Sequence, residues 1–235
     1  MAFFNLHRMK TLSLLLLVLP IGFGTLNAQN LTNLNFAAGS HPITVDKIIR
    51  NDTSLVIQIT LENKLPNGYF CAEKKIVLSD LISGKKTEMD YVEGIPVCPK
   101  MYHFKWVGEK LSFSLYFPVL DTATRYVDLI EVCKENCLII NGLILDSKLN
   151  LLINQGYDAY TNENLSLALE SFQSAITLYP DYPYGFMYGN MIRVLLEQKN
   201  VKEARRWAQK LKNSQISDKY SILRQLNEEK GFSIE

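Results

Sequence analysis

Residues 152–180 read LINQGYDAYTNENLSLALESFQSAITLYP, and this stretch decides the fold of the C-terminal part of the chain. The positions that carry its pattern are Gly156, Ala168, Phe172, Ala175 and Pro180. They are separated by 12, 4, 3 and 5 residues, which is the spacing of a helix-turn-helix repeat unit. No other stretch of the chain offers a pattern of comparable specificity.

Local signals set the limits of the two helices. Ser147 can cap the first helix, and Asn164 can cap the second. In the second helix the apolar residues follow the i, i+3, i+4, i+7 rule of an amphipathic helix. Pro180 disfavours the helical region for Tyr179, so the second helix should end there.

This stretch resembles the tetratricopeptide repeat. Gly156 and Ala168 match the small residues of that family, and Phe172, Ala175 and Pro180 match its second-helix positions. The departures are Leu152, Gln155 and Ala159, where the family prefers Trp, Leu and Tyr. In this family the first helix of each pair lines a concave groove. The resemblance therefore implies a partner-binding groove at Ile153, Tyr157, Tyr160, Arg193 and Leu196.

A weaker copy of the repeat follows. We expect a helix from Pro183 to Gln198 and another beginning after the cap signature of Asn200 and Glu203. A last helix should begin at Ser217 and end at Gly231. Because about three such repeats are needed to stand alone, the first helix is expected to pack against the preceding domain.

Between residues 43 and 145 the hydrophobic period is two, as in half-buried antiparallel strands. Turn signals such as Pro66-Asn67-Gly68 separate the strand-like runs. The runs lie near residues 43–50, 54–63, 69–79, 86–93, 101–106, 110–117, 125–133 and 137–145. Seven or eight short strands at this spacing favour an all-β sandwich, with a small barrel as the alternative. Asn141-Gly142 is expected to form a β-bulge.

Residues 111–131 resemble the last strands of immunoglobulin-like sandwich domains in uncharacterised secreted bacterial proteins. This resemblance implies a fold and no particular activity. The predicted organisation is a signal peptide at 1–28, a β-sandwich domain at 29–145 and a tetratricopeptide-like helical domain at 146–235. The period changes from two to 3.6 near Asp146, where we place the boundary.

Residues 1–28 have the pattern of a secretory signal peptide. Arg8 and Lys10 belong to a basic segment, residues 12–19 are an apolar core, and a small residue, Ala28, ends the stretch. A start at Met9 would give a more compact signal. Without these residues the chain has 23 basic and 24 acidic residues, because two of its 25 Lys and Arg are removed. Such a near-neutral chain predicts neither nucleic-acid nor membrane binding, and we expect a periplasmic or extracellular protein without a membrane span.

All four cysteines lie between residues 71 and 137. An even, clustered set in an exported chain predicts two disulfides, with three connectivities possible. We favour Cys71 with Cys98 and Cys133 with Cys137, against a longer-range alternative. A C-x-x-x-C spacing without a nearby His argues against a redox or metal site.

No catalytic motif was found. His41 and His103 stand alone, and there is no phosphate loop, metalloprotease motif or nucleophile elbow. The sequence therefore predicts an exported, non-enzymatic protein-protein interaction module that needs no cofactor or metal, with an unidentified protein partner. The alternative is an enzyme or a carbohydrate- or peptide-binding protein, with its site on the sandwich loops or at the domain junction.

Overall fold

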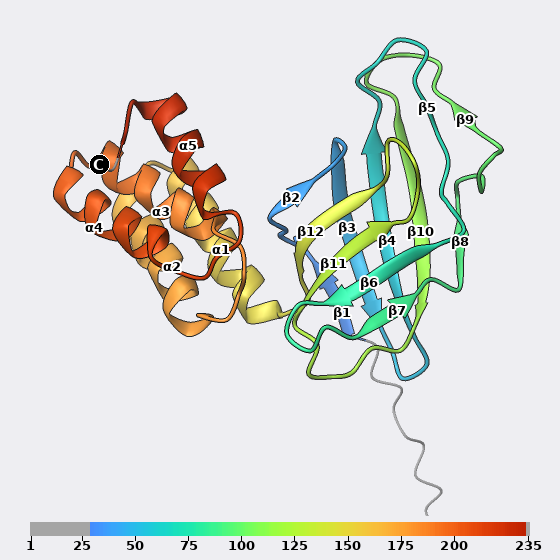
Figure 1. Ribbon diagram of the computed structural model, residues 1–235, viewed down its shortest axis with the longest axis horizontal. Helices are drawn as coiled ribbons and strands as arrows, with labels where there is room; N and C mark the ends of the chain where they lie inside the picture. The colour runs from blue at the N-terminus through green and yellow to red at the C-terminus, as the bar shows by residue number, and fades with distance from the viewer. Residues whose placement is uncertain (1–28, 234–235) are drawn as a thin grey trace, which may run out of the picture.

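The computed structural model describes residues 29–233. A β-rich region comes first and five helices follow (Figure 1). The predicted signal peptide lies outside the described residues. We call residues 29–145 the β-region and residues 146–233 the helical region.

Two five-stranded sheets and one short ribbon form the β-region. The first sheet has the order β1-β3-β4-β10-β8 and the second the order β2-β12-β11-β6-β7. Strands β5 and β9 pair separately. The strands are β1 (Gln29–Thr32), β2 (Ala38–Gly39), β3 (Ile43–Arg50), β4 (Ser54–Glu62), β5 (Tyr69–Phe70), β6 (Ile76–Asp80), β7 (Lys86–Glu88), β8 (Tyr91–Glu93), β9 (Tyr102–His103), β10 (Lys110–Pro118), β11 (Tyr126–Glu131) and β12 (Ile139–Ile144).

Both sheets contribute to one hydrophobic core. Ile57 and Leu115 project from the first sheet, and Leu129 and Ile140 project from the second, all fully buried. Strands β4 and β10 pair antiparallel over nine residues. Their alternating buried residues lie on the same face because successive side chains in a strand point to opposite sides.

Backbone hydrogen bonds fix two of the corners where the chain crosses between the sheets. At one corner Ala37, directly before β2, donates to the carbonyl of Asn141 at 2.8 Å. At the other corner Met89 donates to Ile76, and Asp90 donates to Tyr116, each at 2.8 Å.

The predicted strand positions need three corrections. The run 69–79 is two strands, because Ala72 leaves the ladder to bridge Val97. The run 86–93 is also two strands, which belong to different sheets. Strands β1 and β2 were not predicted, because they are too short to show a period of two. The bulge was predicted correctly: the register of β12 shifts beside Gly142, which has a φ of +67°.

The five helices are α1 (Ser147–Thr161), α2 (Leu165–Leu178), α3 (Phe186–Glu197), α4 (Val201–Lys212) and α5 (Lys219–Lys230). The caps at Asn164, Asn200 and Gly231 agree with the sequence prediction. The cap of α1 is Asp146 instead of Ser147, because the Asp146 carboxylate accepts from two backbone amides of the first turn.

Two further helix starts differ from the prediction. Helix α3 begins at Phe186, three residues after Pro183, because the intervening segment is held against the β-region. Helix α5 begins at Lys219 and not at Ser217. The hydroxyl of Ser217 instead contacts the carbonyl of Pro183, which ties the loop before α5 to the loop before α3.

Gly156 allows α1 and α2 to pack closely. A Cβ added at this position would lie 2.7 Å from two ring atoms of Phe172. Phe172 is 1% exposed, and Tyr157 packs on its edge with the ring centroids 5.5 Å apart. The helix pair therefore depends on a glycine here for space and not for backbone conformation.

We expect Gly156→Ala to lower the free energy of unfolding by about 1–3 kcal/mol, since an extra methyl in a filled core forces its neighbours to move. Urea denaturation followed by far-UV circular dichroism measures this change. The matched control is Gly189→Ala on α3, whose Cβ would meet Ile222 at 3.0 Å and the flexible end of Arg193 at 3.3 Å. An unchanged or increased stability of Gly156→Ala would show that Phe172 moves freely.

Aromatic residues after α2 pack the helical region against the β-region. Tyr182 is 2% exposed and donates to the carbonyl of Gly142 at 2.7 Å. Its ring packs against Tyr126 with centroids 5.1 Å apart. Tyr184 donates to both carboxylate oxygens of Asp128, at 2.9 and 3.0 Å.

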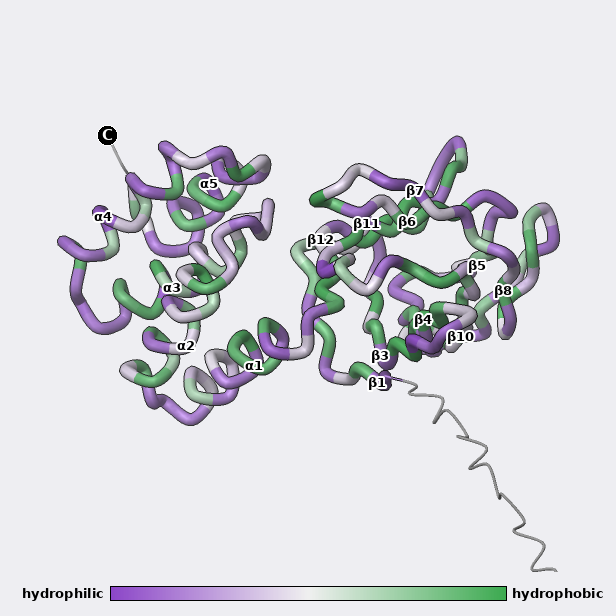
Figure 2. Tube along the Cα trace, turned by 90° about the horizontal axis from the view of Figure 1, so that it is seen from below, coloured by the Kyte–Doolittle hydropathy of each residue, from purple (hydrophilic) through white to green (hydrophobic). Residues whose placement is uncertain are grey.

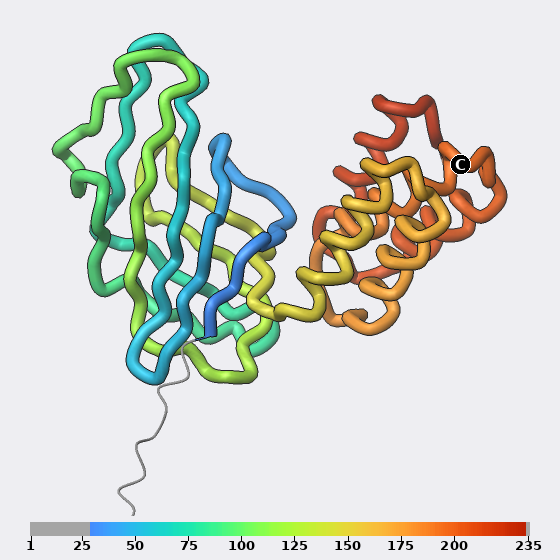
Figure 3. The backbone as a smooth tube through the Cα atoms, turned by 180° about the vertical axis from the view of Figure 1, so that it is seen from behind, coloured from blue at the N-terminus to red at the C-terminus, as the bar shows by residue number. Residues whose placement is uncertain are grey.

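The first helix adds polar contacts, as the shortness of the repeat array predicts. Asn150, which is 4% exposed, accepts from the backbone of Asn35 at 2.8 Å and donates to Ile144 at 2.9 Å. Asn154 donates to the carbonyl of Asn33 at 2.8 Å. Figure 3 shows α1 continuing directly from the end of β12. Tyr126 and Ile144 of the β-region belong to the same apolar cluster as the helices.

Candidate functional site

Helices α1, α3 and α5 form one polar face, and hydrogen bonds between their side chains connect them. We call this surface the helical face. It consists of Tyr157, Tyr160, Asn190, Arg193, Glu197, Glu229 and Lys230.

One row of hydrogen bonds crosses the helical face near its middle. Asn190 donates to the Tyr157 hydroxyl at 2.8 Å, and Arg193 donates to Asn190 at 3.2 Å. Arg193 also donates to both carboxylate oxygens of Glu229, at 2.7 and 3.3 Å. This bond from Arg193 lowers the pKa of Glu229. The row therefore links α1 to α5 through α3.

A second row runs beside the first. The Tyr160 hydroxyl donates to Glu197, and Lys230 lies 3.3 Å from the same carboxylate oxygen. The hydrogen bond to Glu197 raises the pKa of Tyr160. Tyr157 and Tyr160 remain 40% and 39% exposed, so each ring offers a surface to a partner while its hydroxyl is held.

The predicted groove residues do not all reach this face. Tyr157, Tyr160 and Arg193 lie together on it, as the rows of hydrogen bonds show. Ile153 is 0% exposed and belongs to the core between the helices. It offers no surface to a partner, and Leu196 is partly buried against the same core. Sequence reasoning did not identify Asn190, Glu197, Glu229 and Lys230.

A hollow of about 690 Å³ opens at the loop end of the β-region. We call it the loop hollow. Its walls come from residues 40–42, 61–73, 98–104 and 131–136. In Figure 1 this is the upper end of the β-region, near β5 and β9. Its volume lies within the range of about 300–1,000 Å³ that is typical of ligand sites.

Both disulfides border the loop hollow. Cys71 pairs with Cys98 and Cys133 with Cys137, with Cα atoms 5.3 and 5.5 Å apart. The favoured pairing was therefore correct. The Cys71–Cys98 bridge joins two of the wall segments, and the Cys133–Cys137 bridge closes a short loop within a third.

Two titratable groups in the wall of the loop hollow are partly or fully buried. The Glu131 carboxylate is 4% exposed and accepts from the backbone amides of Glu73 at 2.7 Å and Leu138 at 2.6 Å. Burial raises the pKa of Glu131. The His41 ring packs edge-on against Phe70, and burial lowers its pKa.

Ser40 and His41 are adjacent but do not form a nucleophile and base of the usual kind. The Ser40 hydroxyl lies 2.7 Å from Nδ1 of His41. The same hydroxyl contacts the carbonyl of Cys137 and the amide of Ile139, each at 2.8 Å. Ser40 therefore joins the β2–β3 turn to β12, which is a structural role.

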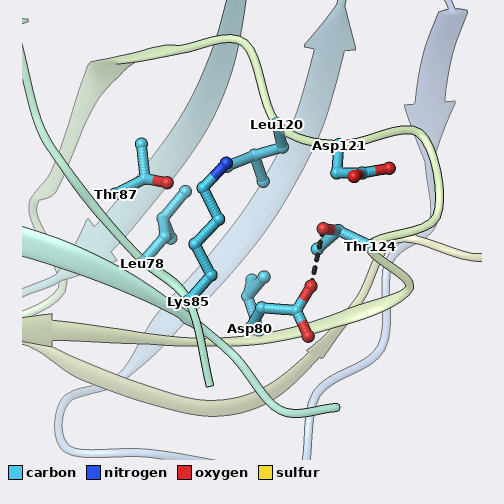
Figure 4. Close-up of a pocket in the computed structure, with 8 residues that line it drawn as sticks. Leu78, Asp80, Lys85, Thr87, Leu120, Asp121 and Thr124 are labelled. Carbon is cyan, nitrogen blue, oxygen red and sulfur yellow. Dashed lines mark hydrogen bonds between the residues drawn. The ribbon is translucent and has the colours of Figure 1, made fainter. Parts of the chain in front are cut away.

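A second cavity lies between the β6–β7 turn and the start of β11, and it is too small for a ligand. Its volume is about 10 Å³, which is room for about one water. Figure 4 shows the Thr124 hydroxyl donating to Asp80 at 2.6 Å across it. Asp80 also accepts from the amides of Ile82 and Ser83, so this cluster shapes a turn.

Over residues 29–233, no three His, Cys, Asp or Glu side chains lie close enough to hold a metal ion. In the same part of the chain, no helix is long and apolar enough to cross a bilayer. A scan against protein-family profiles and searches of curated proteins and of solved structures found no match to this chain.

Proposed function

We propose that this protein is an exported, non-enzymatic module that binds another protein through the helical face. Two disulfides support export, because such bonds persist in oxidising compartments. On this proposal the β-region is an immunoglobulin-like sandwich that carries a short tetratricopeptide-like array. The alternation of α1, α3 and α5 along one face is the arrangement that the repeat resemblance implies.

The observation that carries the proposal is the pair of hydrogen-bonded rows across α1, α3 and α5. Long polar side chains usually lose rotamer freedom when a partner binds, at about 0.5–1.5 kcal/mol each. Arg193 and Glu229 already pair with each other in the folded protein. Much of their rotamer freedom is therefore lost when the chain folds, and less remains to be lost when a partner binds. Exposed tyrosine rings beside them supply contact area, as in known binding surfaces.

The alternative is an enzyme or a carbohydrate- or peptide-binding protein with its site on the β-region loops or at the junction. Tyr182 and Tyr184 fill the junction, which leaves the loops as the place for such a site. The Ser40 hydroxyl in the wall of the loop hollow is occupied by backbone contacts, which favours ligand binding there over catalysis by this serine.

Site-specific photo-crosslinking tests the proposal. A benzophenone amino acid at position 160 on the helical face should give a discrete crosslinked product in the native envelope. The same probe at Tyr220, which is 67% exposed on α5 outside the two rows, is the control and should give none. Tyr157→Ser combined with Arg193→Ala should remove the product. Equal products from both positions, or a product that survives these substitutions, would contradict the proposal.

A further inference from the structure

The rim of the loop hollow exposes large apolar side chains. Leu65 is 67% exposed, Tyr69 57% and Met101 42%. The neighbouring loop adds Trp106 at 60% and Val107 at 54%. Single exposed apolar residues are common, but clusters around a concavity are typical of interaction sites.

The loops that carry this rim are held rigidly. Asn63, which is 5% exposed, donates to the carbonyl of Trp106 at 2.8 Å and accepts from the amide of Leu65 at 3.1 Å. The amide of Phe104 donates to Gly68 at 2.9 Å. The disulfide at Cys71 closes the same segment. A ligand would therefore meet a formed surface and not a loop that must first be ordered.

The ionisable groups of the hollow are mainly acidic. The lining contains four carboxylates, of Glu62, Glu73, Glu131 and Glu135, and one lysine, Lys64. Lys64 is already paired with Glu62, and Glu131 is occupied by backbone amides. Within residues 29–233, no ion pair involves Glu73 or Glu135. These two carboxylates are available to a cation from outside.

We propose that the loop hollow binds a short peptide segment in which apolar side chains alternate with basic ones. The apolar side chains cover Leu65, Tyr69 and Met101, and the basic side chains pair with Glu73 and Glu135. This site lies in the β-region and is independent of the helical face.

Fluorescence anisotropy on the full chain with both disulfides formed tests this proposal. The probe is a labelled heptapeptide of alternating leucine and lysine. Matched peptides replace every lysine with glutamate or every leucine with serine. We expect the leucine-lysine peptide to bind at least about tenfold more tightly than either, because burying one leucine side chain alone is worth about 1.5–3 kcal/mol.

Two sets of variants locate the binding. Leu65→Ser with Tyr69→Ser should weaken it about tenfold or more, through lost apolar burial. Glu73→Gln with Glu135→Gln should weaken it up to about fivefold and reduce its salt dependence, as expected for exposed ion pairs. Both sets change exposed or partly exposed side chains, so thermal melts should match the unchanged protein.

The matched control is Tyr220→Ser with Glu228→Gln on α5, which should bind the peptide unchanged. Tyr157→Ser with Arg193→Ala on the helical face should also leave peptide binding unchanged, and this separates the proposal from the proposed function. Absence of binding, equal binding of the glutamate peptide, or equal losses in the control and hollow variants would each overturn the proposal.

Discussion

Tyr182→Ala should lower the free energy of unfolding by about 3–5 kcal/mol, the range measured when a large buried aromatic side chain is truncated. Tyr182 is 2% exposed and its ring contacts Tyr126, Tyr184 and Phe186. Truncation would leave a cavity between the β-region and the helices. We expect the helical region to lose the most stability, because part of its apolar core is buried against the β-region.

Urea denaturation followed by tyrosine fluorescence and far-UV circular dichroism measures this loss. Tyr182→Phe is the matched variant, because it removes only the bond to Gly142. It should cost about 1–3 kcal/mol, since a buried carbonyl is left without its donor. The surface control Tyr220→Ala should stay within about 0.5 kcal/mol. A Tyr182→Ala effect as small as that of the control would show that the junction does not stabilise the protein.

Removal of the Cys71–Cys98 bridge should cost about 3.5 kcal/mol. The bridge closes a segment with a sequence separation of 27, and chain entropy for a loop of that length gives this value. The Cys133–Cys137 bridge has a separation of 4, so the same relation gives only about 2 kcal/mol.

The comparison uses Cys71→Ala with Cys98→Ala against Cys133→Ala with Cys137→Ala, by urea denaturation under oxidising conditions. We expect the first pair to lose clearly more stability than the second. The reverse order would show that native contacts near Cys133 and Cys137, and not loop entropy, set the contribution of these bridges. Neither pair should change the far-UV spectrum, because both bridges lie at loops beside strands.

Periodicity made most of the secondary structure predictable. Strands β3, β4 and β10 were predicted within one residue, because their alternating apolar residues face one core. Figure 2 shows green hydrophobic and purple hydrophilic residues interspersed along the strands and helices. The caps at Asn164 and Asn200 were predictable, because a side-chain cap is a local interaction. The split of 86–93 between two sheets was not, because both halves have ordinary strand composition.

The candidate sites were less predictable than the fold. Tyr157, Tyr160 and Arg193 were identified through the repeat resemblance, while their partners Asn190 and Glu197 were not. A hydrogen bond across 33 or 37 residues depends on the packing of α1 against α3, and no local pattern encodes it. The loop hollow had only an indirect signal, the turn at residues 66–68.

The sequence by itself determined the order of strands before helices, the caps at Asn164, Asn200 and Gly231, and the bulge at Gly142. Each of these follows from interactions between residues that are near in the chain, or from the two periods of 2 and 3.6. Only the tertiary structure decided that Tyr182 and Tyr184 dock the helices on the β-region, that α1, α3 and α5 share one face, and that four separate segments enclose the loop hollow. These features depend on contacts between distant residues, which form only when the core brings the elements together.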